Sequence, residues 1–306
     1  LILTLIGLLL LAGGLAMAVI APLEMACFPL FSEGGRFHFE GFSFGSLVFA
    51  IIAWQVIAYD FIALVCIPLG YGHVRRRSWT RTLTLTALWS WLIVGAPLSV
   101  AIWFMAISFK DPSQTMALFI LPLLGLLIYP VLPAILIRFY NSEGVKHTFE
   151  QQDPKSNWIH AMPIPILVLS FLFVFYLIVL HVPFFFNGIF PLFGTWANEM
   201  QGMLVADGAI LCLAALTWGT LRRKAWAWWS DVVYFGLLTT SVIVTLVQSS
   251  LSDILALTRL APLEMQIFQN VPLQGWHLAM FIGMPLVATL GLILFSHPHF
   301  REFEDA

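Results

Sequence analysis

Eight long apolar runs constrain the fold of this chain more than any other feature of its sequence. A helix needs about 20 consecutive, mostly apolar residues to cross the hydrocarbon core of a bilayer. The runs are continuous and do not alternate apolar with polar residues as barrel strands do, so they predict helices. They cover residues 1–20, 44–69, 82–107, 115–138, 162–181, 202–220, 231–250 and 277–296.

The composition agrees with this prediction. Hydrophobic residues make up 60% of the chain, charged residues 10%, and the mean hydropathy is +0.92. A soluble globule of this composition would lack the polar residues that its surface needs. We therefore predict an all-α integral membrane protein with about eight transmembrane helices. The lipid bilayer is its first partner, and no nucleic-acid partner is expected.

The first run has a second interpretation, as a cleaved signal peptide. Ala16, Met17 and Ala18 resemble a processing site made of small residues. No basic segment precedes the run, although signal peptides usually carry one. A retained transmembrane helix is therefore the favoured interpretation.

Lysine and arginine predict the orientation of the chain, because short cytoplasmic loops hold an excess of them. Eleven of the fourteen lie in alternate loops and in the C-terminal tail, which predicts that both termini are cytoplasmic. The bacterial cytoplasmic membrane is the expected location. These eleven are Arg75, Arg76, Arg77, Arg81, Arg138, Lys146, Lys155, Arg222, Arg223, Lys224 and Arg301; the other three are Arg36, Lys110 and Arg259.

Two basic loops repeat each other. Residues 72–79 match residues 219–226 without a gap, and at the same offset Asp60 aligns with Asp207. Because a repeat with an even number of spans keeps its orientation, we predict two parallel four-helix halves related by a pseudo-two-fold axis along the membrane normal. The predicted halves are residues 1–140 and 161–300, with a cytoplasmic connector at 141–160 and a tail at 301–306.

The repeated basic loops also carry tryptophans beside their charges. Basic clusters next to a span attract anionic lipid head groups, and tryptophan favours the interface between lipid and water. Ordinary interfacial anchoring explains both features, with specific head-group binding as the alternative. The candidates are Arg75, Arg76, Arg77, Trp79, Arg222, Arg223, Lys224 and Trp226.

Short repeated motifs lie on the opposite side of the membrane. Pro-Leu-Glu-Met occurs at 22–25 and 262–265, and Phe-Pro-Leu-Phe at 28–31 and 190–193. Proline suits the first turn of a helix and glutamate suits the positive end of its dipole, which predicts short interfacial helices. These segments are membrane-hugging connectors or, alternatively, contacts for a partner. The candidates are Pro22, Glu24, Phe28, Phe31, Phe190, Phe193, Pro262 and Glu264.

Asp60 is the most informative single residue, because it lies in the middle of an apolar run. A carboxylate at this depth is costly and normally faces the bundle interior, a water path or a partner. One interpretation makes it a proton or cation site, with Asp207 as its repeat mate. The other makes it a hydrogen-bonded acid that joins helices through Gln55, Tyr59 or Ser90.

The sequence predicts neither a cofactor nor a metal site. Its three cysteines form no C-x-x-C pair, and H-E-x-x-H and glycine-rich phosphate loops do not occur. His181 and His277 reach the outer boundary of their runs, which leaves a haem or chlorin between them as a weaker alternative. Histidines at a polar interface are the favoured interpretation, since axial ligands of membrane cofactors usually project from well inside a helix.

These features favour a non-catalytic accessory or scaffolding subunit of a larger membrane complex, with other membrane subunits as partners. The alternative is a small-molecule or ion transporter that uses Asp60 in the helix bundle. Parallel halves and helix-breaking prolines are typical of transporters. An enzyme is not expected, because no catalytic set converges at one depth.

Overall fold

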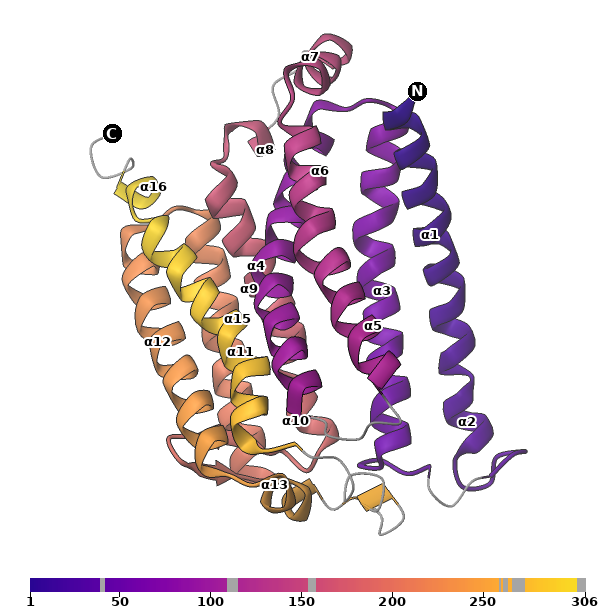
Figure 1. The fold of residues 1–306 in the computed structure, drawn as a ribbon, viewed down its shortest axis with the longest axis vertical. Helices are drawn as coiled ribbons and strands as arrows, with labels where there is room; N and C mark the ends of the chain where they lie inside the picture. The colour runs from indigo at the N-terminus through magenta and orange to yellow at the C-terminus, as the bar shows by residue number, and fades with distance from the viewer. Residues whose placement is uncertain are drawn as a thin grey trace.

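The chain forms the predicted all-α membrane fold in a computed structural model, drawn in Figure 1. The structure describes residues 1–38, 42–108, 115–153, 158–258, 260, 264–265 and 273–301. Eight of the helical segments in these residues are long and apolar enough to span a bilayer. Each coincides with one of the eight predicted runs. Seven have ends shifted by six residues or fewer, and the first extends to Phe31, which is 11 residues beyond its predicted end.

The spans are joined by short helices and one two-stranded sheet. The elements are α1 (Ile2–Met25), α2 (Cys27–Phe31), α3 (Leu47–Val74), α4 (Ser78–Ser108), α5 (Thr115–Leu126), η2 (Leu127–Val131), α6 (Leu132–Tyr140), α7 (Glu143–Gln152), α8 (Trp158–Ala161), α9 (Ile164–Val179), α10 (Val182–Phe185), β1 (Phe190–Leu192), β2 (Thr195–Ala197), α11 (Glu199–Leu221), α12 (Ala225–Gln248), α13 (Leu251–Thr258), α15 (Gly275–Phe295) and α16 (Pro298–Arg301).

The two ends of the bundle differ in what they carry. Both termini, the repeated basic loops and α7 lie at one end, named here the terminal end (Figure 1). The β1–β2 hairpin and α13 lie at the other, the hairpin end. The helix α7 occupies the predicted connector at 141–160, where Asp153 accepts a hydrogen bond from the Ser78 backbone at the start of α4.

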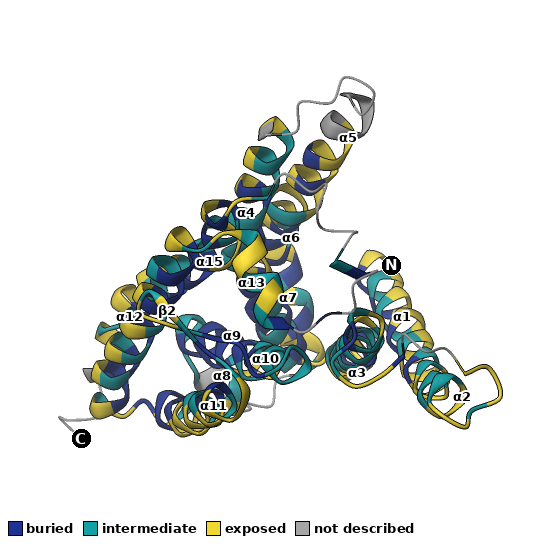
Figure 2. Cartoon of the chain, turned by 90° about the horizontal axis from the view of Figure 1, so that it is seen from below, coloured by how far each residue is buried: buried dark blue, intermediate teal, exposed yellow. Residues whose placement is uncertain are grey.

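Helices α1 and α3 form a two-helix arm that extends from the rest of the bundle (Figure 2). Glycines allow this close contact, since Cβ atoms at Gly7, Gly14 and Gly70 would lie within 2.8 Å of atoms of the facing helix. Small residues at such positions let transmembrane helices approach backbone to backbone. The remaining faces of both helices carry many exposed apolar side chains.

The largest core lies outside the arm. It joins α9, α11, α12 and α15 around fully buried residues such as Phe173, Leu213 and Phe235. Helix α4 packs against both α9 and α15, and so connects the two predicted halves. A smaller cluster at the terminal end joins α4, α6 and α7 around Leu85, Tyr140 and Phe149.

The repeated basic loops adopt the same backbone conformation. Arg76 and Arg223 have φ angles of 50° and 54°, and each lies two residues beyond the last residue of its helix. Arg77 N donates to Gly72 O as Lys224 N donates to Gly219 O, which closes the helix end with a left-handed residue. The local repeat therefore extends to structure, while the pseudo-two-fold axis between whole halves stays a prediction.

The orientation in the membrane is testable with reporters fused to the chain. Because basic residues concentrate at the terminal end, we expect reporters after Arg77, Ser142 or Lys224 to score cytoplasmic. Reporters after Asn187 or Asp253, at the hairpin end, should score external. Compartment-specific enzyme fusions measure this directly, and a cytoplasmic signal at Asn187 would contradict the predicted orientation.

Candidate functional site

Asp60 lies halfway along α3, and its side chain is exposed on the surface of the arm. Of the three environments expected for an acid at this depth, the interior of the bundle is therefore not the one that Asp60 occupies in this chain. Within the described part of the chain, no group pairs with it or hydrogen-bonds to it, and Gln55, Tyr59 and Ser90 do not hold it. The reason is that α3 uses its glycine-bearing face to bind α1 and turns a different face outward.

Asp207 repeats this arrangement on α11. Its side chain is also exposed and forms no hydrogen bond or ion pair with another described group. Asp207 precedes Arg222 by the same 15 residues that separate Asp60 from Arg75. At 1.5 Å of rise per residue, both carboxyl groups lie about 22 Å along their helices from the basic loops. This is well inside a hydrocarbon core about 30 Å thick.

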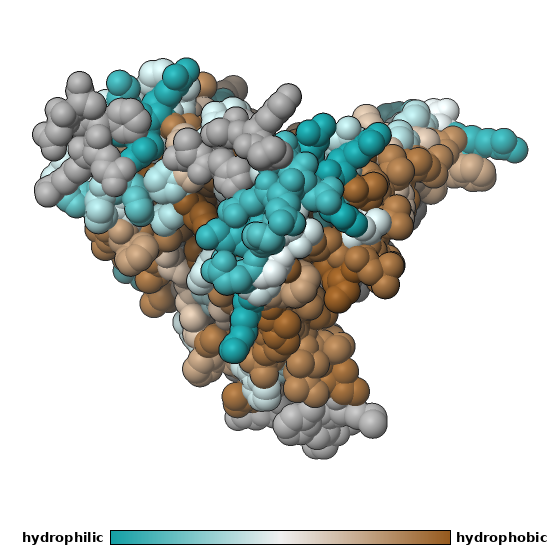
Figure 3. Space-filling model, turned by 90° about the horizontal axis from the view of Figure 1, so that it is seen from above, coloured by the Kyte–Doolittle hydropathy of each residue, from teal (hydrophilic) through white to brown (hydrophobic). Residues whose placement is uncertain are grey.

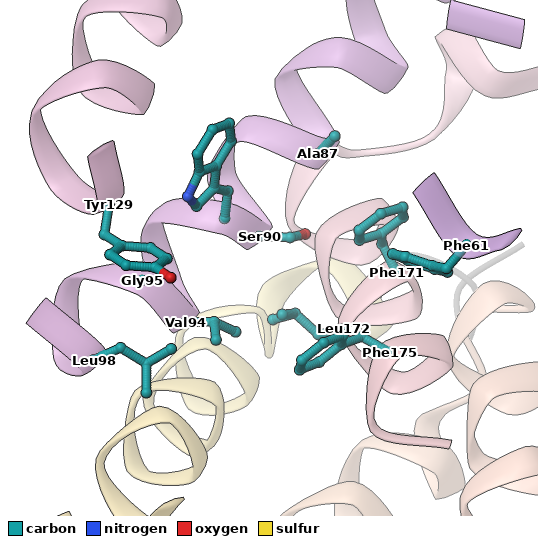
Figure 4. Close-up of a pocket in the computed structure, with 11 residues that line it drawn as sticks. Phe61, Ala87, Ser90, Val94, Gly95, Leu98, Tyr129, Phe171, Leu172 and Phe175 are labelled. Atoms are coloured by element: carbon teal, nitrogen blue, oxygen red, sulfur yellow. The ribbon is translucent and has the colours of Figure 1, made fainter. Parts of the chain in front are cut away.

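A cavity of about 310 Å³ opens where the arm meets α4, η2 and α9 (Figure 4). Phe61 of α3 and Phe171 of α9 pack together on one side, with ring centroids 5.7 Å apart. On the other side Tyr129 lies over Gly95, where a Cβ would come within 2.9 Å of its ring. The lining is almost wholly apolar, and neither Asp60 nor Asp207 belongs to it. Such a cleft suits an acyl chain or an apolar side chain better than an ion.

The turn that places Tyr129 in this cleft is a π-helical segment, η2. Pro130 lies within it and lacks the N–H that would continue an α-helix, which explains the irregular turn. Single π-turns inside membrane helices are frequent at functional sites. Pro68, Pro97 and Pro285 also lie inside spans, but α3, α4 and α15 continue through them, so these three prolines do not break their helices.

The basic loops divide into exposed and structural residues. Arg75, Arg77, Arg222, Lys224 and Trp226 are exposed at the terminal end, while Arg76 and Trp79 are half-buried. Figure 3 shows polar residues gathered over this end and apolar residues on the flanks, as interfacial anchoring requires.

Arg223 differs from its neighbours in being buried. Its Nε donates to His299 O at 2.9 Å, so this guanidinium joins α11 to α16 and does not face lipid head groups. Arg77 has a second role as well, because its Nη1 lies 3.6 Å from Asp153 Oδ1. This ion pair, in which Arg77 is exposed and Asp153 is largely buried, joins the end of α7 to the start of α4.

The repeated motifs at the hairpin end adopt different structures, although their sequences are alike. Pro22 and Glu24 lie inside α1, so Pro22 does not begin a separate helix, and Glu24 Oε2 is a buried atom without a hydrogen-bond partner. Phe28 and Phe31 pack with Phe42, with ring centroids 5.6 and 5.9 Å apart. These rings are half-buried in a cluster that closes the arm at its hairpin end.

The second Phe-Pro-Leu-Phe motif forms a strand and a turn in place of a helix. Phe190 is buried, with only 6% of its surface exposed, so it is not available to a partner. Phe193, by contrast, is 52% exposed at the tip of the hairpin, with a φ of 45°. Gly194 follows with a φ of 91°, and two such residues make the tight turn that antiparallel strands prefer.

Glu264 has an unpredicted role as a helix cap. Its Oε1 accepts a hydrogen bond of 2.9 Å from Leu47 N at the start of α3, where a negative charge stabilises the helix dipole. Ser46 Oγ accepts a second one from Phe49 N. This hydrogen bond attaches Glu264, which lies between α13 and α15 in the sequence, to the arm. Pro262 lies outside the described residues.

The two histidines at the hairpin end have separate local roles. His181 is exposed, and its Nδ1 donates to Leu177 O at 2.7 Å. His277 is buried, stacks on Trp276 and accepts a hydrogen bond from Gln274 N, so it caps α15. No group of three or more metal-ligating side chains occurs among the residues that the structure describes. A haem or chlorin between these two histidines stays the weaker, untested alternative.

Two buried polar residues at the terminal end were not among the candidates predicted from the sequence. His73 is fully buried between Leu69 O and the Tyr140 hydroxyl, at 2.7 Å from each, and joins α3 to α6. Asp231 is fully buried in α12, where one carboxylate oxygen accepts from Thr220 at 2.7 Å and the other has no partner. Both lie near the ends of their predicted runs, where polar residues are expected, so no sequence signal marked them.

The geometry is thus that of a membrane bundle with two exposed intramembrane acids and an apolar cleft. Comparisons with protein-family models, with curated proteins and with solved structures give no match for this chain.

Proposed function

We propose that this protein is a non-catalytic accessory subunit of a larger membrane complex, and that the arm is its main contact with a partner subunit. The observation that carries this proposal is the exposed carboxyl group of Asp60 at mid-depth on α3. A charged side chain at the centre of a transmembrane helix costs about 3 kcal/mol on insertion scales. No described residue of the chain offsets this cost.

A partner subunit would offset it by bringing a basic or hydrogen-bonding group to the same depth. The arm leaves room for such a partner, because Leu5, Leu9 and Leu64 are among its many exposed apolar side chains. A lone membrane protein also exposes apolar side chains to lipid, so these contribute little evidence by themselves. Asp60 is stronger evidence for a partner, because the hydrocarbon of lipid cannot form a hydrogen bond or ion pair with its carboxyl group.

The transporter alternative has less support. It needs Asp60 inside the bundle or in a polar cavity, and Asp60 lies on the outer surface. A second cavity lies between the hairpin and helices α9, α12 and α15, where Phe190, Pro191 and Trp196 line it from the hairpin side. This cavity and the cleft at Phe61 are both lined almost wholly by apolar side chains, and neither has an acidic residue in its lining. No observation of the described residues favours an ion path.

Substitution of Asp60 tests the proposal. We expect Asp60→Leu to reduce at least about tenfold the share of the chain that migrates in a complex on native gels after mild solubilisation, because a polar interhelical contact contributes about 1–2 kcal/mol. The 34.3 kDa chain itself should stay folded and membrane-inserted, since leucine suits lipid better than aspartate. Asp60→Glu should retain most of the complex.

A matched control moves the acid without removing it. The double variant Asp60→Leu/Ile62→Asp keeps the net charge and almost the same depth of the acid, but places the carboxylate on another exposed face of α3. We expect it not to restore the complex. A wild-type chain that migrates alone, or an Asp60→Leu chain that assembles normally, would contradict the proposed function.

A further inference from the structure

The surroundings of Asp60 and Asp207 match beyond the two acids. On α3, exposed residues follow Asp60 at helical spacing toward the terminal end; these are Leu64, Pro68 and Tyr71, named here with Asp60 the Asp60 stripe. On α11, exposed residues share a face with Asp207; these are Leu204, Leu211 and Trp218, named here with Asp207 the Asp207 stripe. Intervals of three, four and seven residues place each set on one side of its helix.

The repeat offset that aligns the acids also aligns their exposed neighbours. Leu64 corresponds to Leu211, and the two side chains are 72% and 71% exposed. Tyr71 corresponds to Trp218, and these two side chains, near the terminal end, are 50% and 56% exposed. Each stripe therefore presents an acid, a leucine one turn away and an aromatic ring three turns away, in the same order and direction.

The two helices that carry the stripes lie at the same side of the bundle. Helices α3 and α11 both lie along the lower edge of Figure 2, apart from one another. They also run in the same direction, since each begins at the hairpin end and leads to a basic loop of the same backbone conformation at the terminal end. A helix that fits one stripe would therefore meet the other in the same orientation.

We propose that the two stripes bind two copies of one transmembrane helix, which carries a basic side chain opposite each aspartate. This rests on the proposed function and specifies its partner. The basic group follows from charge, because only a cation or strong donor offsets a carboxylate in hydrocarbon. The two copies follow from the matched residues, since equivalent surfaces bind equivalent partners.

A second copy of this chain does not provide that helix. Within the described spans, the only arginines or lysines are Arg81 and Arg138, and both lie near the terminal end of their helices. None of them reaches the depth of Asp60, so a contact between two copies would bring acids together without a base. The expected partner is a different subunit with a lysine, arginine or histidine in mid-span.

Photo-crosslinking in the native membrane tests this inference. A photoreactive phenylalanine analogue replaces Leu64 or Leu211 in the tagged full-length chain, with Val233 on α12 as an exposed position outside both stripes. We expect the same foreign polypeptide at both stripes, linked within about one helical turn of a basic residue in one of its spans, and no such product from Val233.

The aspartates supply the specificity of the test. Asp207→Leu should reduce the product at Leu211 about tenfold and change that at Leu64 less than about twofold, and Asp60→Leu should do the reverse, because each polar contact is local. Different polypeptides at the two stripes, a product at only one, a second copy of this chain, or no dependence on the aspartates would overturn the inference. Lipid products alone at both stripes would overturn the proposed function as well.

Discussion

Gly7→Leu is expected to separate α1 from α3 and to lower the melting temperature of the solubilised protein by about 5 °C or more. A Cβ at Gly7 would lie 2.7 Å from His73 Cβ and 3.0 Å from Gly70 O, so a leucine requires the helices to move apart. Overpacking of this kind costs about 1–3 kcal/mol, and 1 kcal/mol corresponds to about 2–4 °C in a chain of 150–250 residues. The displacement would also disturb the contact between His73 and Tyr140.

Gly13→Leu is the matched control in the same helix, because a Cβ at Gly13 meets no atom within 4 Å. Both variants add the same side chain, but only Gly7 faces α3. A second measurement isolates the arm: Cys66, which is half-buried close to Gly14, should react faster with a membrane-permeant maleimide in Gly7→Leu. Equal melting temperatures and equal Cys66 reactivity in the two variants would show that the glycine contacts do not hold the arm.

The eight spans were predictable because hydropathy is a property of consecutive residues. A run long enough to cross the bilayer forms a helix in almost any context, since its backbone must satisfy its own hydrogen bonds. The basic loops were predictable for a similar reason. The eight residues of each loop contain their own turn, so the matching segments from Gly72 and Gly219 have matching backbones.

The direction in which Asp60 faces could not be predicted in the same way. Sequence shows the depth of a residue, but its burial depends on which other helices pack against which face. Here α1 occupies the face of α3 that carries Gly70, and no described helix covers the face of Asp60. The expectation that intramembrane acids face inward holds for complete assemblies, and a chain considered alone need not satisfy it.

The two Phe-Pro-Leu-Phe motifs show the same limit at the level of local structure. Residues 28–31 lie in α2, whereas residues 190–192 form β1, although the letters are identical. The second copy is followed by Gly194, which permits the turn, and it lies beside hydroxyl groups of α12 that accept and donate hydrogen bonds. Tertiary contacts therefore determine whether this motif forms a helix or a strand, and the sequence of four residues alone cannot predict it.

Ser241 and Thr245 hold the hairpin on α12, and their removal should release it. Thr245 Oγ1 accepts from Gly194 N at 2.9 Å, while Ser241 Oγ accepts from Phe193 N at 3.0 Å and donates to Pro191 O at 2.8 Å. The double variant Ser241→Ala/Thr245→Val leaves three backbone groups without these partners. At about 1 kcal/mol for each, the free energy that keeps the hairpin closed falls by about 3 kcal/mol.

We expect a rise of about 100-fold in the rate at which a protease cleaves between residues 186 and 198, because about 1.4 kcal/mol corresponds to a factor of ten in the open population. The measurement adds protease to membrane vesicles whose outer surface presents the hairpin end, and then identifies the fragments by mass spectrometry. Thr240→Val is the control on the same helix, since Thr240 is exposed and makes no contact with the hairpin. If the double variant and Thr240→Val are cleaved at the same rate, the hydroxyl groups do not stabilise the hairpin, and the burial of Phe190 alone must hold it over the cavity that it covers.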